Sequence, residues 1–127
     1  MGYRSNVMAL VYAGNDKNEE GGMSMSDEYA KLKTLMNTTY KDLLDEWGAD
    51  FQWLDERHVL KFTCDDVKWY PSYPAVVAFS KYLQEIEELG FATEYVRIGE
   101  ETDDIDEQYS ERAEYYLSVS RVINCEV

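Results

Sequence analysis

The sequence predicts a single α+β domain over residues 1–127. We expect a ferredoxin-like split β-α-β-β-α-β arrangement with one additional C-terminal strand, in which two helices cover one face of an antiparallel sheet. Two segments repeat apolar residues at spacings of three and four, others have the length and apolar pattern of strands, and their order along the chain matches this plan. With 45% apolar and 14% aromatic residues, the 127-residue chain can bury a core of its own.

The first predicted element is a strand over residues 3–13. Its second half, residues 7–12, is apolar on both faces. Continuous apolarity at strand length is typical of a central strand that is covered on both sides. Residues 14–26 then contain Gly-Asn-Asp and Glu-Glu-Gly-Gly, which predict a loop.

A helix is predicted next, over residues 27–47. Ser26 is suited to cap its N-terminus, and Gly48 stands where a left-handed C-cap is expected. Apolar residues at helical spacing form one stripe, which consists of Tyr29, Leu32, Met36, Tyr40, Leu43 and Trp47.

Two strands and a second helix follow. Phe51 and Trp53 alternate with polar neighbours in a short strand, and after a turn at residues 55–57 a second strand carries Leu60, Phe62 and Cys64 on one face. The second helix is predicted over residues 74–89, because proline is tolerated in a first helical turn and Gly90 ends the segment. Its apolar stripe consists of Val76, Phe79, Leu83 and Ile86.

The C-terminal third is predicted to add two strands. Residues 91–98 predict one strand, the acidic residues 100–107 a loop, and residues 115–127 a last strand that joins a sheet edge or pairs with residues 91–98. Cys64 and Cys125 are expected to be two small buried side chains rather than a disulfide.

Charge is the feature that says most about partners. The formal net charge is −14, and six of the eight residues 100–107 are acidic with no base among them. Such a surface repels nucleic acid, phosphates and anionic membranes and attracts basic protein surfaces or cations. The candidate partner-binding residues are Glu100, Glu101, Asp103, Asp104, Asp106, Glu107 and Tyr109.

Three other interpretations of the acidic run stay open: a solvated loop, weak binding of a divalent ion, and mimicry of the phosphates of nucleic acid. Mimicry requires carboxylates from the rest of the chain to share one face with the run. The carboxylates concerned are Asp45, Glu46, Asp50, Asp55, Glu56, Glu85, Glu87 and Glu88.

A second candidate site combines basic and aromatic residues. Arginines on strands must face solvent or find a partner, and guanidinium groups bind phosphates and carboxylates while aromatic rings stack on ligand rings. The group therefore predicts a structural ion-pair network, a pocket for a small anionic ligand or a protein-contact surface. Its members are Tyr3, Arg4, Lys68, Trp69, Tyr70, Arg97 and Arg121.

Little in the sequence points to catalysis. His58 is the lone imidazole, Ser118 and Ser120 lack nucleophile-elbow glycines, and Cys64 lies on a predicted core face that would raise its pKa. We predict no catalytic residue, no cofactor and no metal site. The apolar run at residues 7–13 is too short to span a membrane.

Three stretches resemble a group of small uncharacterised proteins of tailed bacteriophages. They are Met1-Gly2-Tyr3-Arg4-Ser5, then Asp66-Val67-Lys68-Trp69-Tyr70 with Ser72-Tyr73, and Val96-Arg97-Ile98-Gly99-Glu100 with Asp103-Asp104-Ile105, Tyr116-Leu117 and Val119-Ser120-Arg121. The resemblance implies a phage accessory protein that acts in the cytoplasm of the host cell. It brings no known activity and therefore no catalytic residues.

The leading hypothesis is a non-enzymatic acidic protein that binds a basic host protein, as a nucleic-acid mimic or an anti-defence inhibitor. The alternative is a binding protein or enzyme for a small nucleotide-like anion, held by Arg97, Arg121 and Trp69. Homodimerisation through an exposed sheet edge is a third hypothesis.

Overall fold

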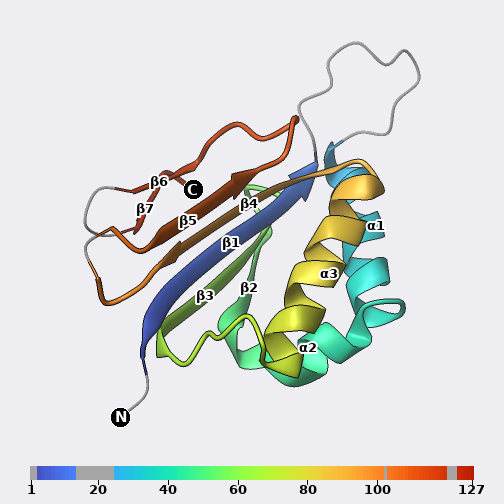
Figure 1. Cartoon of the computed structure of the whole chain (residues 1–127). Helices are drawn as coiled ribbons and strands as arrows, with labels where there is room; N and C mark the ends of the chain where they lie inside the picture. The colour runs from blue at the N-terminus through green and yellow to red at the C-terminus, as the bar shows by residue number, and fades with distance from the viewer. Residues whose placement is uncertain (1–2, 14–24, 102, 120–122) are drawn as a thin grey trace.

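The computed structural model describes residues 3–13, 25–101, 103–119 and 123–127. Over these residues the α+β class is confirmed, with three helices and a five-stranded antiparallel sheet in the order β2-β3-β1-β4-β5 (Figure 1). The sheet consists of β1 (Ser5–Ala13), β2 (Phe51–Leu54), β3 (Val59–Val67), β4 (Phe91–Ile98) and β5 (Ile105–Tyr109). The other elements are α1 (Met25–Asn37), α2 (Lys41–Trp47), the short 3₁₀ helix η1 (Gly48–Asp50), α3 (Pro74–Glu88), and the two-stranded sheet of β6 (Leu117–Val119) and β7 (Ile123–Cys125).

The prediction of one helix over residues 27–47 is wrong, because the segment divides into α1 and α2. At the break, the Asn37 side-chain amide and the Thr38 hydroxyl each donate to the backbone carbonyl four residues earlier, at 2.8 and 2.7 Å. Side chains that bond locally in this way offer the backbone an alternative to a continuous helix. The apolar stripe is nevertheless continuous, since Met36 of α1, Tyr40 of the turn and Leu43 of α2 are all buried.

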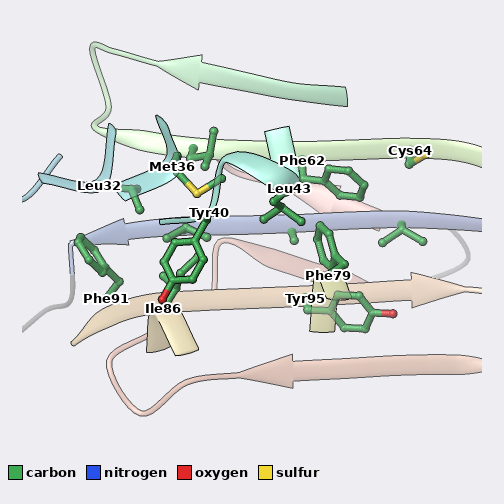
Figure 2. Close-up of a cluster of buried hydrophobic side chains, with 14 of the residues drawn as sticks. Leu32, Met36, Tyr40, Leu43, Phe62, Cys64, Phe79, Ile86, Phe91 and Tyr95 are labelled. Atoms are coloured by element: carbon green, nitrogen blue, oxygen red, sulfur yellow. The ribbon is translucent and has the colours of Figure 1, made fainter. Parts of the chain in front are cut away.

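The three helices lie on one face of the sheet and bury a core rich in aromatic side chains (Figure 1). Figure 2 shows Phe62 of β3 against Phe79 of α3, and their ring centroids are 4.6 Å apart. Trp47 adds an edge contact to Phe62 at 5.7 Å. Burying large rings removes much apolar surface from water, and the edge-on and tilted contacts add to that gain.

The C-terminal segment covers the opposite face of the sheet, which corrects the predicted last strand. The described residues of the segment 115–127 do not add a strand to the sheet; β6 and β7 pair only with each other. Leu117 is buried there in a second cluster with residues of β1, β3 and β4, namely Leu10, Tyr12, Val59, Ala92 and Val96. Since β1 is apolar on both faces, this cover removes from water a surface that the helices leave open. The expectation that β1 is covered on both sides is thereby confirmed.

A second correction concerns the acidic run, whose second half is a strand and not a loop. β5 pairs with β4 in antiparallel register, with Ile98 opposite Ile105 and Arg97 opposite Asp106. An apolar pair and a pair of opposite charges facing each other across two strands stabilise that register. The strand predicted from residues 115–127 is thus supplied by residues 105–109.

Glu94 connects the sheet to the C-terminal segment through a buried carboxylate. The residue is completely buried, and its two oxygens accept the N–H groups of Tyr116 at 3.1 Å and Leu117 at 2.9 Å. The Tyr12 hydroxyl also donates to Glu94, and it accepts the N–H of Glu114 at 2.7 Å. Burial and the neighbouring Glu94 carboxylate both raise the pKa of Tyr12. These bonds attach residues 114–117 to Tyr12 near the end of β1 and to Glu94 in the middle of β4.

Candidate functional site

Arg97 of β4 binds the turn that the first half of the acidic run forms. Its guanidinium contacts Asp104 Oδ1 at 2.5 Å and Asp106 Oδ2 at 2.8 Å, and it donates to Ser5 Oγ at 3.0 Å. Only 13% of the Arg97 side chain is exposed. The guanidinium, together with a hydrogen bond from Tyr3, lowers the pKa of Asp104 below its usual value. Two of the seven candidate partner-binding residues, Asp104 and Asp106, therefore share one arginine within the chain, and the group of three keeps a single net negative charge.

Tyr3 attaches the same turn to the N-terminal segment. Its hydroxyl donates to Asp104 Oδ2 at 2.6 Å and accepts the N–H of Glu101 at 3.0 Å. The N–H of Arg4 donates to Glu100 Oε2 at 3.2 Å. The turn is thus held by hydrogen bonds, while Glu100, Glu101 and Asp103 remain exposed at its surface.

Gly99 is the residue on which this turn depends. A Cβ at this position would overlap the Asp104 carboxylate and the Tyr3 hydroxyl. We expect Gly99→Ala to separate that pair and to lower the free energy of unfolding by about 1–3 kcal/mol. Urea denaturation measures the loss. Gly48→Ala is the control, because a Cβ there meets nothing within 4 Å and a similar loss would contradict the explanation.

Among the described residues, the aromatic and basic members of the predicted group do not form a pocket for an anionic ligand. Trp69 is 4% exposed, its indole N–H donates to the Tyr95 hydroxyl at 2.9 Å, and its ring packs 5.2 Å from the centroid of Phe79. The Trp69 ring is therefore part of the helix-side core and cannot stack on a ligand. Tyr70 accepts the N–H of Tyr3 at 2.6 Å.

The described basic members of that group lie near one end of the sheet, but they do not converge on a common ligand position. Arg4 donates to the backbone carbonyl of Asp66 at 3.2 Å, Arg97 is occupied by carboxylates, and Lys68 is exposed. Arg121 lies outside the described residues. The ion pairs of Arg97 match the structural network that the sequence offered as an alternative.

A concave surface of about 720 Å³ lies between α3 and β5 and forms an acidic groove. Its wall on α3 includes Glu87 and Glu88, its wall on β5 includes Asp106 and Glu107, and Tyr95 lies between them on β4. The twelve residues that line it are Ser80, Leu83, Gln84, Glu87, Glu88, Thr93, Tyr95, Asp106, Glu107, Gln108, Tyr109 and Ser110. Four of these lining residues are acidic and none is basic, so the groove favours a cationic occupant.

Glu87 and Glu88 were not among the binding residues predicted from the sequence. They were predicted only as carboxylates that phosphate mimicry would require. The available signal was their position on the polar side of α3, away from the buried Val76, Phe79 and Ile86. That signal could not place them beside residues 106–110, because the acidic run was predicted to be a loop.

The other carboxylates named for phosphate mimicry do not all share the groove. Glu46 lines a separate pocket of about 510 Å³ between α2 and α3, and Asp55 accepts hydrogen bonds from Lys33 at 2.8 Å and from the Tyr29 hydroxyl at 2.7 Å. Asp106 is paired with Arg97. The groove carboxylates without a cationic partner among the described residues are therefore those of Glu87 and Glu88, since the Glu107 side chain points to the opposite face of the sheet, where the Tyr109 hydroxyl donates to it.

The two cysteines and the histidine, which are the side chains considered for catalysis or metal binding, pack against other residues of the chain. Cys64 and Cys125 are free thiols that lie in the clusters on opposite faces of the sheet, as expected of two unpaired cysteines. Burial raises the pKa of the Cys64 thiol to about 11, as its core position predicts. The His58 ring packs against Tyr29 at 5.4 Å. In the described residues, no three His, Cys, Asp or Glu side chains gather as a metal site would require.

Comparison with known proteins identifies no relative from which a function could be inferred. None of the helices in the described ranges has the length and apolar character needed to cross a membrane. No protein-family model, curated protein or solved structure matches this chain.

Proposed function

We propose that this protein is a non-enzymatic binding protein that holds a basic segment of a protein partner in the acidic groove. The observation that carries the proposal is the groove itself, which sets Glu87 and Glu88 of α3 opposite the acidic strand β5. Its lining residues include no base, and Glu87 and Glu88, which have no cationic partner among the described residues, attract a cationic segment. The net charge of −14 adds long-range steering of a basic partner towards the molecule.

The resemblance to phage proteins supports a narrower form of the proposal. In it, the partner is a basic protein of the bacterial host that normally handles nucleic acid, and the acidic protein occupies its phosphate-binding surface.

For the fold, we propose the ferredoxin-like split arrangement for the first six predicted elements. The position of β1 between β3 and β4, with the helices on one face, supports it.

The alternative function, a binding protein for a nucleotide-like anion, has less support. It needs free arginines and an exposed ring. Arg97 is instead paired with Asp104 and Asp106, and Trp69 is buried.

Capture from a bacterial lysate at two ionic strengths tests the proposal. We expect basic proteins to be retained at low salt and released as salt rises, because screening shortens the reach of surface charges to about 10 Å at 0.1 M. An unrelated acidic protein of similar net charge is the control. If it retains the same basic proteins, the groove has no specific role and the proposal fails.

A further inference from the structure

The outer edge of β5 is the place where the sheet can be extended. β5 pairs with β4 on one side, and in the described part of the chain no strand pairs with its other side. An edge strand presents unpaired N–H and C=O groups that can bond to another extended chain. The acidic groove runs beside this edge, since residues 106–110 line it.

The register identifies which backbone groups face outward. The N–H of Gly99 donates to the Asp104 carbonyl at 2.8 Å, and the N–H of Ser110 donates to the Thr93 carbonyl at 3.0 Å. In an antiparallel pair, hydrogen-bonded positions recur at every second residue. Asp106 and Gln108 therefore direct their backbone groups to β4, opposite Arg97 and Tyr95.

The alternate residues direct their backbone groups to the free edge. These are Ile105, Glu107 and Tyr109. The N–H of Ile105 already donates to the Asp103 carbonyl at 3.1 Å. The N–H groups of Glu107 and Tyr109 are thus the two donors that an added strand would use.

The side chains of β5 and of the facing groove wall indicate which residues an added strand should carry. Asp106 and Gln108 point to the helix side, together with Tyr95 and with Glu87 and Glu88 across the groove. Every second residue of an added strand would point to that side as well. Basic residues at alternate positions would therefore meet the groove carboxylates.

A second copy of this chain is a poor occupant of the same edge. Symmetric antiparallel pairing of β5 with β5 would set Glu107 against its own copy, and like charges directly opposite each other destabilise a sheet. The edge is therefore suited to a basic chain rather than to itself.

We propose that an extended basic segment of the partner adds to the outer edge of β5 as a sixth strand, with its alternate basic side chains in the acidic groove. This inference rests on the proposed function and specifies how the groove is used. It is an instance of recognition by strand addition, in which main-chain bonds give affinity and alternate side-chain sites give specificity.

Amide hydrogen exchange on the whole protein tests the geometry directly. The probe is a short synthetic peptide in which lysine alternates with threonine, and the control peptide has the same composition with its lysines grouped at one end. In the free protein, the amides of Asp106 and Gln108 should exchange slowly and those of Glu107 and Tyr109 quickly. On binding the alternating peptide, the Glu107 and Tyr109 amides should become protected.

A pair of variants separates backbone bonding from charge. Glu107→Pro and Glu107→Gln remove the same charge, but only proline also removes an outward N–H, and proline is tolerated in edge strands. We expect Glu107→Pro to bind the alternating peptide about fivefold more weakly than Glu107→Gln, the equivalent of one lost hydrogen bond. A slowly exchanging Gln108 amide in Glu107→Pro reports that β5 is still paired with β4.

The outcomes distinguish this inference from the function on which it rests. Protection of the two outward amides, with weaker binding by Glu107→Pro, supports strand addition. Binding of both peptides alike, with no new protection and equal affinity of the two variants, overturns strand addition and leaves a basic partner in the groove. If neither peptide binds at low salt, both proposals are overturned.

Discussion

Replacing Glu94 with alanine is expected to lower the free energy of unfolding by roughly 3–5 kcal/mol, because three donors lose their buried acceptor. The donors are the Tyr12 hydroxyl and the N–H groups of Tyr116 and Leu117. Water cannot replace the lost carboxylate easily, since Glu94 is completely buried. Urea denaturation should record the loss as a lower midpoint.

The conservative variant Glu94→Gln separates the loss of acceptors from the loss of volume. An amide keeps the shape of the carboxylate but turns one oxygen into a donor, which then faces an N–H that needs an acceptor. We expect Glu94→Gln to be destabilised by roughly 1–3 kcal/mol, less than the alanine variant. Hydrogen exchange at Tyr116 and Leu117 should accelerate in both variants.

An exposed glutamate provides the control for Glu94. Glu111→Ala removes a carboxylate at an exposed position and should change stability by no more than about 0.5 kcal/mol. If Glu94→Ala is no less stable than Glu111→Ala, the buried carboxylate does not hold the C-terminal segment in place.

Reversing the charge of the groove by Glu87→Lys with Glu88→Lys should weaken binding of a basic partner by about tenfold or more. Rim charges act on the approach of the partner, and two reversals replace attraction with repulsion at roughly 1.4 kcal/mol or more in total, which is the equivalent of tenfold. The fold should tolerate the change, because both residues are exposed in the last turn of α3, where the helix dipole favours cations.

A variant with the same change in net charge elsewhere is the matched control. Asp45→Lys with Glu56→Lys alters two exposed carboxylates that do not line the groove. Titration of the alternating lysine-threonine peptide should give an affinity within about twofold of the native value for this control. The difference between the two variants should shrink as salt rises. Equal losses in both would mean that the charge acts diffusely and the groove has no special role.

The sequence predicted those elements whose apolar pattern is regular. The stripe from Tyr29 to Leu43 and the doubly apolar strand β1 both pack as their periodicity indicates. The helix break at Asn37 and Thr38 depends on which carbonyl each side chain bonds, and an apolar pattern does not carry that information.

The C-terminal part could not be predicted in the same way. β5 has the burial pattern of a surface strand, with Ile105 and Tyr109 half-buried and three exposed polar residues between them. What makes it a strand is the partner across the sheet, where Arg97 faces Asp106. Tertiary pairing here outweighs a local composition that is typical of a loop.

The candidate site depended on that missed strand. Counting charges identified the acidic run, but the groove also needs Glu87 and Glu88, which are brought to it only when β5 extends the sheet beyond β4. Trp69 was misassigned for a related reason: a tryptophan in an aromatic connection can face a ligand or the core, and the indole bond to Tyr95 commits it to the core.

The central place of β1 also affects how the chain folds as it is synthesised. Tyr12 pairs with Val59 on one side and with Ala92 on the other, so both partners of β1 are made long after it. Until they emerge from the ribosome, the nascent chain carries an apolar strand with two free edges and no cover on either face. Aggregation is therefore a greater hazard during synthesis than in the finished domain, and this part of the sheet closes only through contacts between distant segments.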